Sequence, residues 1–130
     1  MVNRILSKPF AAIAWTILIQ VLLCLPGKSL PTGGVFELPQ LDKIIHFTLF
    51  GGCVAIWCYF FYLKGTPQGR LKTIFFIIYL LVSANGIILE FVQRDYIPNR
   101  SFDLADIIAD VIAASIGYGI CNIKLLKTIS

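Results

Sequence analysis

Four apolar segments dominate this chain and restrict the folds available to it. They cover residues 10–25, 44–63, 73–92 and 104–123. A helix needs roughly 17–25 mostly apolar residues to cross a bilayer core of about 30 Å, and the first segment is the shortest of the four. With 58% hydrophobic and only 14% charged residues, the 130-residue chain also differs from an average soluble domain. The sequence therefore predicts an all-α protein whose single domain, residues 1–130, is a bundle of four transmembrane helices.

The first apolar segment has an alternative interpretation as a cleaved signal peptide. Arg4 and Lys8 precede its apolar run, as in the charged region of a signal sequence. However, no small residues suited to cleavage come before Leu25, and Leu23 precedes Cys24 where a lipoprotein signal would need a small side chain. A retained transmembrane helix is the favoured interpretation.

The loops between the apolar segments differ in charge. One side of the predicted bundle, which includes both chain ends, has seven basic residues and no acid: Arg4, Lys8, Lys64, Arg70, Lys72, Lys124 and Lys127. The other side has four basic residues and all seven acids. Because cytoplasmic loops are enriched in Lys and Arg, this bias predicts that both termini are cytoplasmic. It also accounts for the net charge of +4 without a nucleic-acid partner.

The last apolar segment has a stripe of acids along its first turns. Asp103, Asp106 and Asp110 are three and then four residues apart, so a helix places them on one face. The stripe continues through Ala113 to Gly117, where it changes from acidic to small residues. A carboxylate at the centre of a membrane helix costs roughly 2.5–3.5 kcal/mol, and less near its end, so these acids need partners. Asp103 is also a candidate N-cap of this helix, together with Ser101 in the preceding loop.

Two other predicted helices bring polar residues to the same side of the membrane. Asp42 and His46 are four residues apart at the start of the second span, where they can face each other along one side. Glu90 and Gln93 continue a polar stripe up the third span that also includes Gly86. Residues 93–100 are expected to form the loop to the last helix. Counted inward from the outer boundary, three ionisable residues lie about one turn deep, and they are His46, Glu90 and Asp106. Asp110 lies one turn deeper.

Three cations stand just above this level, and they are Lys43, Arg94 and Arg100. Arg100 is the expected partner of the acids, because its guanidinium fork can hold two carboxylates and stays charged. The cluster then has two interpretations. It could be structural, with the charges balancing one another and pinning the helices together, or it could mark a ligand, ion or reaction site, as intramembrane ionisable residues do by default.

In their order along the chain, these motifs resemble the VanZ-like family of small bacterial integral membrane proteins. The resemblance covers residues 26–120 and rests on Asp42-Lys43-x-x-His46, Glu90-x-x-Gln93 and Arg100-Ser-Phe-Asp103-x-x-Asp106-x-x-x-Asp110 with Gly117. The family usually has Asn at the position of Asp110 and Gly at that of Ala113. The resemblance implies a four-helix protein of the bacterial cytoplasmic membrane, linked in the family's namesake to low-level resistance to the glycopeptide teicoplanin. It implies no settled reaction.

One functional hypothesis is that an outward-facing polar pocket binds or shields an anionic, lipid-linked envelope component. Lys43, Arg94 and Arg100 would contact phosphate, while the acids orient these cations or contact sugar hydroxyls and amines. The candidate ligand-binding residues are Asp42, Lys43, His46, Glu90, Gln93, Arg94, Arg100, Asp103, Asp106 and Asp110. The expected partners are membrane lipids, including a lipid-linked cell-wall intermediate.

The alternative hypothesis is an intramembrane hydrolase or transferase that acts on such a lipid. Its catalytic residues would be His46, Glu90 and Asp106, with His46 as general base and its ring oriented by Asp42 or Glu90. The pair Asp106 and Asp110 could hold a divalent ion, although the sequence names no cofactor, metal or oligomeric state. An ion pathway ranks last, because the helices become apolar or small below Asp110.

Overall fold

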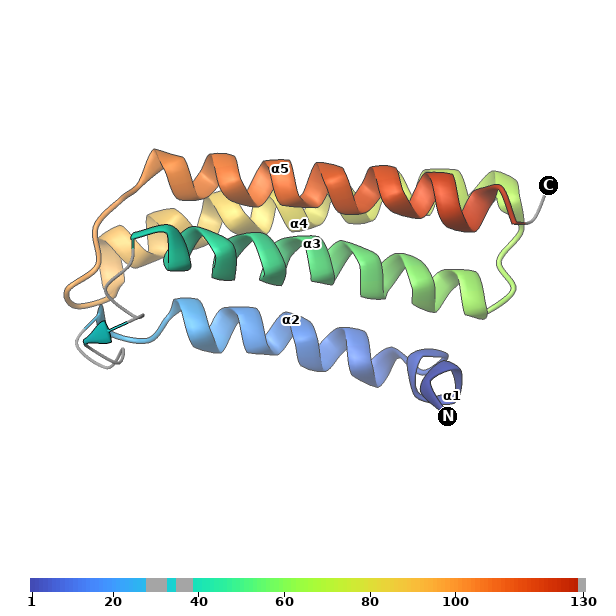
Figure 1. The fold of residues 1–130 in the computed structure, drawn as a ribbon, viewed down its shortest axis with the longest axis horizontal. Coiled ribbons are helices and arrows are strands. Elements are labelled where there is room, and N and C mark those ends of the chain that lie inside the picture. The colour runs from blue at the N-terminus through green and yellow to red at the C-terminus, as the bar shows by residue number, and fades with distance from the viewer. Residues whose placement is uncertain (28–32, 35–38, 129–130) are drawn as a thin grey trace.

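The computed structural model describes residues 1–27, 33–34 and 39–128, and its regular secondary structure is helical. The elements in chain order are α1 (Val2–Leu6), α2 (Pro9–Leu23), α3 (Pro39–Leu63), α4 (Gln68–Tyr96) and α5 (Leu104–Cys121), which continues into a π-helical segment at Asn122–Leu126. Helices α2 to α5 lie side by side along the long axis of the molecule, and α1 sits at an angle before α2 (Figure 1). The predicted all-α bundle is confirmed.

Three helices are long and apolar enough to cross a membrane, and they indicate a membrane protein. These candidate spans are Gln40–Leu63, Gln68–Tyr96 and Leu104–Leu126. Helix α2 is apolar but has 15 residues, which correspond to about 22 Å of helix, less than the bilayer core of about 30 Å. The structure therefore has three helices of spanning length and a shorter fourth one.

Helix α5 has the polarity expected of a membrane helix, with its small and acidic face turned inward. Ile108, Ile112, Ile116 and Ile120, at four-residue spacing, are all about half exposed. The buried residues of the same helix are acids, alanines, a glycine and a cysteine: Asp106, Asp110, Ala113, Ala114, Gly117 and Cys121. An amphipathic helix of a water-soluble protein has the opposite arrangement. The outer face of α5 is thus suited to contact with lipid hydrocarbon rather than with water.

Small residues let α3 and α5 approach closely. A Cβ atom on Gly117 would lie 2.9 Å from the backbone oxygen of Gly51, and one on Gly51 would lie 3.3 Å from that of Ala113. Small residues at such contacts are the usual means of helix association in membranes. The small stripe predicted on the last helix therefore packs within the bundle.

Polar side chains join α2 to the other helices. Trp15 donates its indole N–H to the carbonyl of Leu49 at 2.9 Å, and Gln20 donates to the side-chain oxygen of Asn85 at 3.1 Å. Gly52 makes room for the Trp15 ring, which would lie 2.9 Å from a Cβ at that position. Asn85 thus links α4 to α2.

Two helices extend beyond the apolar segments that identified them. Helix α3 begins at Pro39, three residues before Asp42, which was expected at its start; proline suits the first turn of a helix, where its missing N–H costs nothing. Helix α4 continues to Tyr96, so the expected loop at 93–100 is wrong in its first four residues. The helix stops there because the next residue, Ile97, has the extended backbone that is favoured before a proline such as Pro98.

Candidate functional site

Ionisable side chains from three helices meet at the end of the bundle where α3 and α5 begin and α4 ends. Four of them are almost completely buried, with exposed fractions of 1–6%: His46, Glu90, Asp106 and Asp110. Asp42 joins them from the first turn of α3 and is half-buried. We refer to these five residues as the acid–histidine cluster.

The centre of the cluster is a buried pair between His46 and Asp110. Nδ1 of the imidazole lies 2.9 Å from Oδ1 of the Asp110 carboxylate. The sequence led us to expect Asp42 or Glu90 as the residue that orients the ring, and this expectation is wrong. Because α3 begins at Pro39, His46 lies two turns inside the helix and is level with Asp110 rather than a turn above it.

The surroundings of this pair fix the orientation of both side chains. Gly86 of α4 leaves space for Asp110, whose Oδ2 would lie 2.9 Å from a Cβ at that position. Phe50 stacks on the imidazole, with ring centroids 6.3 Å apart and an interplanar angle of 13°. On the other edge of the ring, Nε2 is buried and has no hydrogen-bond partner in the part of the chain that the structure describes.

Lys43 is the cation of the cluster. Its ammonium lies 3.2 Å from Oδ1 of Asp106 and 3.4 Å from Oδ2 of Asp103. The sequence favoured Arg100 for this role, but its Nε donates to the carbonyl of Leu25 at 3.3 Å, and it forms no ion pair within the described residues. Lys43 takes this role because it lies near the start of α3, within reach of Asp103 and Asp106 at the start of α5.

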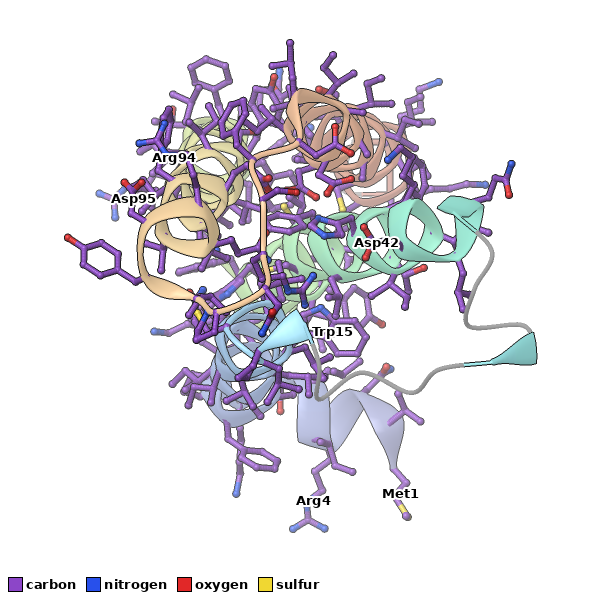
Figure 2. The ribbon with its side chains drawn as sticks, turned by 90° about the vertical axis from the view of Figure 1, so that its left-hand side faces the viewer. Met1, Arg4, Trp15, Asp42, Arg94 and Asp95 are labelled. Atoms are coloured by element: carbon purple, nitrogen blue, oxygen red, sulfur yellow. The ribbon has the colours of Figure 1, made fainter. Side chains whose placement is uncertain are left out.

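Arg94 lies outside the cluster, contrary to its predicted role as a ligand-binding cation. It forms an ion pair with Asp95 at 2.6 Å, and both side chains are about half exposed. Figure 2 shows the two residues on the outer side of α4, whereas Asp42 faces the interior of the same end of the bundle. Arg94 lies one helical turn beyond Glu90, toward the end of α4, and its side chain turns outward to Asp95 and the Phe91 ring.

Gln93 and Asp103, two further predicted ligand-binding residues, make contacts that secure helix ends. Gln93 is buried and donates its side-chain amide to the carbonyl of Leu23, 2.7 Å away at the end of α2. Asp103 is the N-cap of α5, as expected, and its carboxylate accepts from the N–H of Ala105 at 2.8 Å. That hydrogen bond, followed by the nearby ammonium of Lys43, lowers the pKa of Asp103 below its usual value.

Glu90 connects the end of α4 to the start of α5. Its Oε1 accepts a hydrogen bond from the backbone N–H of Asp103. This N–H precedes the first turn of α5, and its charge-assisted bond to a carboxylate is stronger than a neutral one. Glu90 therefore holds the two helices in register beside the cluster.

Three members of the cluster bring potential metal ligands together. One ligand atom each from Asp42, His46 and Asp106 can be chosen so that all lie within 4.8 Å of one another. The sequence suggested Asp106 and Asp110 as the pair for a divalent ion. Asp110 is instead engaged by His46, and Asp42 takes its place because the first turn of α3 faces α5.

The acid–histidine cluster is rich in carboxyl groups. It contains four carboxylates, with Lys43 as the cation in direct contact and Asp103 as a further acid at its edge. Phe50 and Gly86 both shape the cluster, but the sequence points to only one of them. Gly86 lies on the predicted polar stripe, whereas Phe50 is one aromatic residue within an apolar run and gives no signal.

Comparison with known proteins adds no further assignment to this site. The chain matches no protein-family model, no curated protein and no solved structure.

Proposed function

We propose that this protein is a VanZ-like membrane protein of the bacterial cytoplasmic membrane that acts on the head group of a lipid-linked envelope component. The proposed topology has four spans with both termini in the cytoplasm and the acid–histidine cluster at the outer surface. The distribution of basic residues supports this orientation, since Lys64, Arg70 and Lys72 lie at the opposite end of the bundle from the cluster.

The observation that carries the proposal is the buried pair of His46 and Asp110. An imidazole that is hydrogen-bonded to a carboxylate at Nδ1 has its tautomer fixed, so that Nε2 faces its surroundings as a base or as a ligand. Helix packing alone does not need such a pair, because small residues already bring α3 and α5 together. Buried ionisable groups in membrane helices are costly, and a functional role explains their presence.

Between the two functional hypotheses, the geometry favours a hydrolase or transferase over a site that merely binds phosphate. Phosphate binding would need several converging cations. Of the three predicted cations, Arg94 is paired with Asp95 on the outer side of α4, and Lys43 is shared by two carboxylates. The third, Arg100, donates to the carbonyl of Leu25. A carboxylate-rich site with a fixed imidazole is better suited to proton transfer, or to holding a cation that meets the substrate.

The test is protection of a teicoplanin-sensitive bacterium that expresses the chain, with membrane levels of all variants matched. Wild-type protein is expected to raise the tolerated concentration of teicoplanin, and Glu90→Gln to abolish most of that gain. The Gln side chain keeps an oxygen that can accept the hydrogen bond from Asp103, so the variant removes the charge while preserving the link between α4 and α5. Arg94→Gln is the matched control and should protect as well as wild type, because Arg94 lies outside the cluster.

Two results would count against the proposal. Wild-type protein that gives no protection would separate this chain from glycopeptide resistance. Equal protection by wild type and Glu90→Gln would place the activity elsewhere in the molecule.

A further inference from the structure

The free edge of the His46 imidazole is the starting point for a further inference. His46 is 1% exposed, and its Nε2 has no hydrogen-bond partner within the described residues. A buried polar atom of this kind costs free energy unless something pairs with it. Since Nδ1 is held by Asp110, any ligand of this ring must be taken by Nε2.

Carboxylates next to this ring provide the remaining ligands. Asp42 is half-buried and makes no hydrogen bond or ion pair to any described residue. Asp106 uses Oδ1 to contact Lys43, so its Oδ2 remains available. One ligand atom each from Asp42, His46 and Asp106 can be chosen so that the three lie within 4.8 Å of one another. Small side-chain rotations would bring them to the separations of about 3.3 Å that tetrahedral ligands at about 2.0 Å require.

The electrostatic balance of the site also calls for a cation. Four carboxylates meet here. Among the described residues, Lys43 contacts one of them, Asp106, and His46 pairs with another, Asp110. At the end of a membrane bundle, such a concentration of carboxyl groups is unfavourable. A divalent ion would neutralise two of the carboxylates and satisfy Nε2 at the same time.

We propose that Asp42, His46 and Asp106 bind a divalent transition-metal ion, with Zn²⁺ as the best match, and that Asp110 is the positioning residue that orients the histidine ligand. One imidazole and two carboxylates leave the fourth tetrahedral position of Zn²⁺ open to water or substrate, as in catalytic zinc sites. Imidazole disfavours Ca²⁺ and Mg²⁺, which prefer oxygen ligands, while Mn²⁺ accepts both donor types. The carboxylate of Asp110 on Nδ1 completes the carboxylate–histidine–metal arrangement common to such sites.

This metal site deepens the proposed function and shares its residues. A bound cation explains how an acidic cluster could receive an anionic head group, because the ion would meet the phosphate that the carboxylates alone repel. Asp42 is half-buried, so its side of the site gives the ion access from solvent. Metal binding itself needs no substrate and can be measured independently of any envelope phenotype.

The test uses the full chain, purified in detergent with an affinity tag that contains no histidine, and incubated with Zn²⁺, Mn²⁺, Mg²⁺ or Ca²⁺ separately. Elemental analysis gives the metal content per chain, and competition with a chromogenic chelator gives the affinity. We expect one Zn²⁺ per chain, and a loss of affinity of more than about 100-fold in Asp42→Asn, His46→Gln and Asp106→Asn, since even outer-sphere changes cost about 10–100-fold. Asp110→Asn should fall within that smaller range, and Asp95→Asn on the outer side of α4 should bind as wild type does.

Two further readouts separate metal binding from folding. Lys43→Gln is expected to bind Zn²⁺ more tightly, because it removes a cation that competes for Asp106, whereas a variant that merely unfolds would bind less. His46 is the chain's single histidine, so its two ¹⁵N signals can be assigned directly, and Zn²⁺ should shift Nε2 far more than Nδ1.

The proposal is overturned if wild-type protein binds each ion only substoichiometrically, or if His46→Gln binds Zn²⁺ as tightly as wild type does. Stoichiometric Zn²⁺ binding without protection from teicoplanin would leave the metal site standing and reject the proposed function. Protection by a wild-type chain that binds no metal would reject the metal site and leave the proposed function standing.

Discussion

Gly86 determines how closely the Asp110 carboxylate can approach α4. A Cβ at this position would lie 2.9 Å from Oδ2 and 3.0 Å from Cβ of Asp110, and 3.1 Å from the ring of Phe50. Both neighbours are themselves held by His46, one through a hydrogen bond and the other by stacking. The lack of a side chain at Gly86 of α4 therefore determines the geometry of the contact between His46 of α3 and Asp110 of α5.

Gly86→Ala is expected to destabilise the protein and to distort the pair of His46 and Asp110. Overpacking of this kind costs about 1–3 kcal/mol, which exceeds the gain of about 1 kcal/mol in helix propensity. Thermal unfolding in detergent measures the first effect, and a change in the Nδ1 signal of the single histidine measures the second.

Gly69→Ala is the control for this substitution, since it lies on the same helix with no atom within 4 Å of the added Cβ. It should be neutral or stabilising. An unchanged Nδ1 signal in Gly86→Ala would mean that Asp110 is not confined by α4.

At the scale of elements, α3 and α5 form the contact on which the site depends. Gly51 and Gly117 bring the two backbones together in the middle of the bundle, and the pair of His46 and Asp110 joins the same helices nearer their outer ends. A change in the spacing of these helices at the glycine contact should therefore also change the geometry of the acid–histidine cluster. Helix α4 contributes differently, since Glu90 holds the backbone at the start of α5.

Gly117→Ala should lower stability and weaken the site although it lies about two turns from Asp110. Its Cβ would meet the backbone oxygen of Gly51 at 2.9 Å, and a backbone atom yields less readily than a flexible side chain. We expect a loss of about 1–3 kcal/mol in the free energy of unfolding, measured in detergent by thermal or denaturant titration.

Gly119→Ala gives the comparison within the same helix, because no atom lies within 4 Å of its added Cβ. Its stability should match or exceed that of wild type. If the two variants behave alike, the close approach of α3 and α5 does not limit stability.

At the scale of the whole molecule, the two ends of the bundle have different chemical characters. One end holds the acid–histidine cluster and Asp103, and the other has the basic turn that joins α3 and α4. The middle is apolar, with buried residues such as Phe50, Val54 and Phe75. The enrichment of Lys and Arg in cytoplasmic loops leads us to expect the basic end on the cytoplasmic side.

The proposed orientation predicts which introduced cysteines a membrane-impermeant maleimide can reach in intact cells. Tyr96→Cys, at the acidic end and 79% exposed in the native residue, should be labelled in intact cells. Gly69→Cys, at the basic end, should be labelled only after the membrane is permeabilised. Both variants are made in a chain whose four native cysteines are replaced by alanine. If only Gly69→Cys is labelled in intact cells, the orientation is opposite to the proposed one.

Sequence alone was sufficient for the fold class and for the membership of most of the cluster. Apolar length identifies the membrane helices, and four-residue spacing places Asp106 and Asp110 on one face, because both properties are local. It also named Asp103 as one of two candidate N-caps, with Ser101, since capping depends on residues within one turn. The VanZ-like resemblance and the function remain predictions.

The partners of the charged residues were decided by the tertiary structure. The packing of α3 against α5 brings His46 to Asp110, so that the ring bonds this carboxylate and not that of Asp42 or Glu90. Arg94 pairs with Asp95 instead of joining the cluster, and Lys43 takes the position predicted for Arg100. Spacing along one helix fixes which side chains share a face, but the axial offset and rotation between helices fix which faces meet, and these come from the packing of Gly51, Gly86 and Gly117.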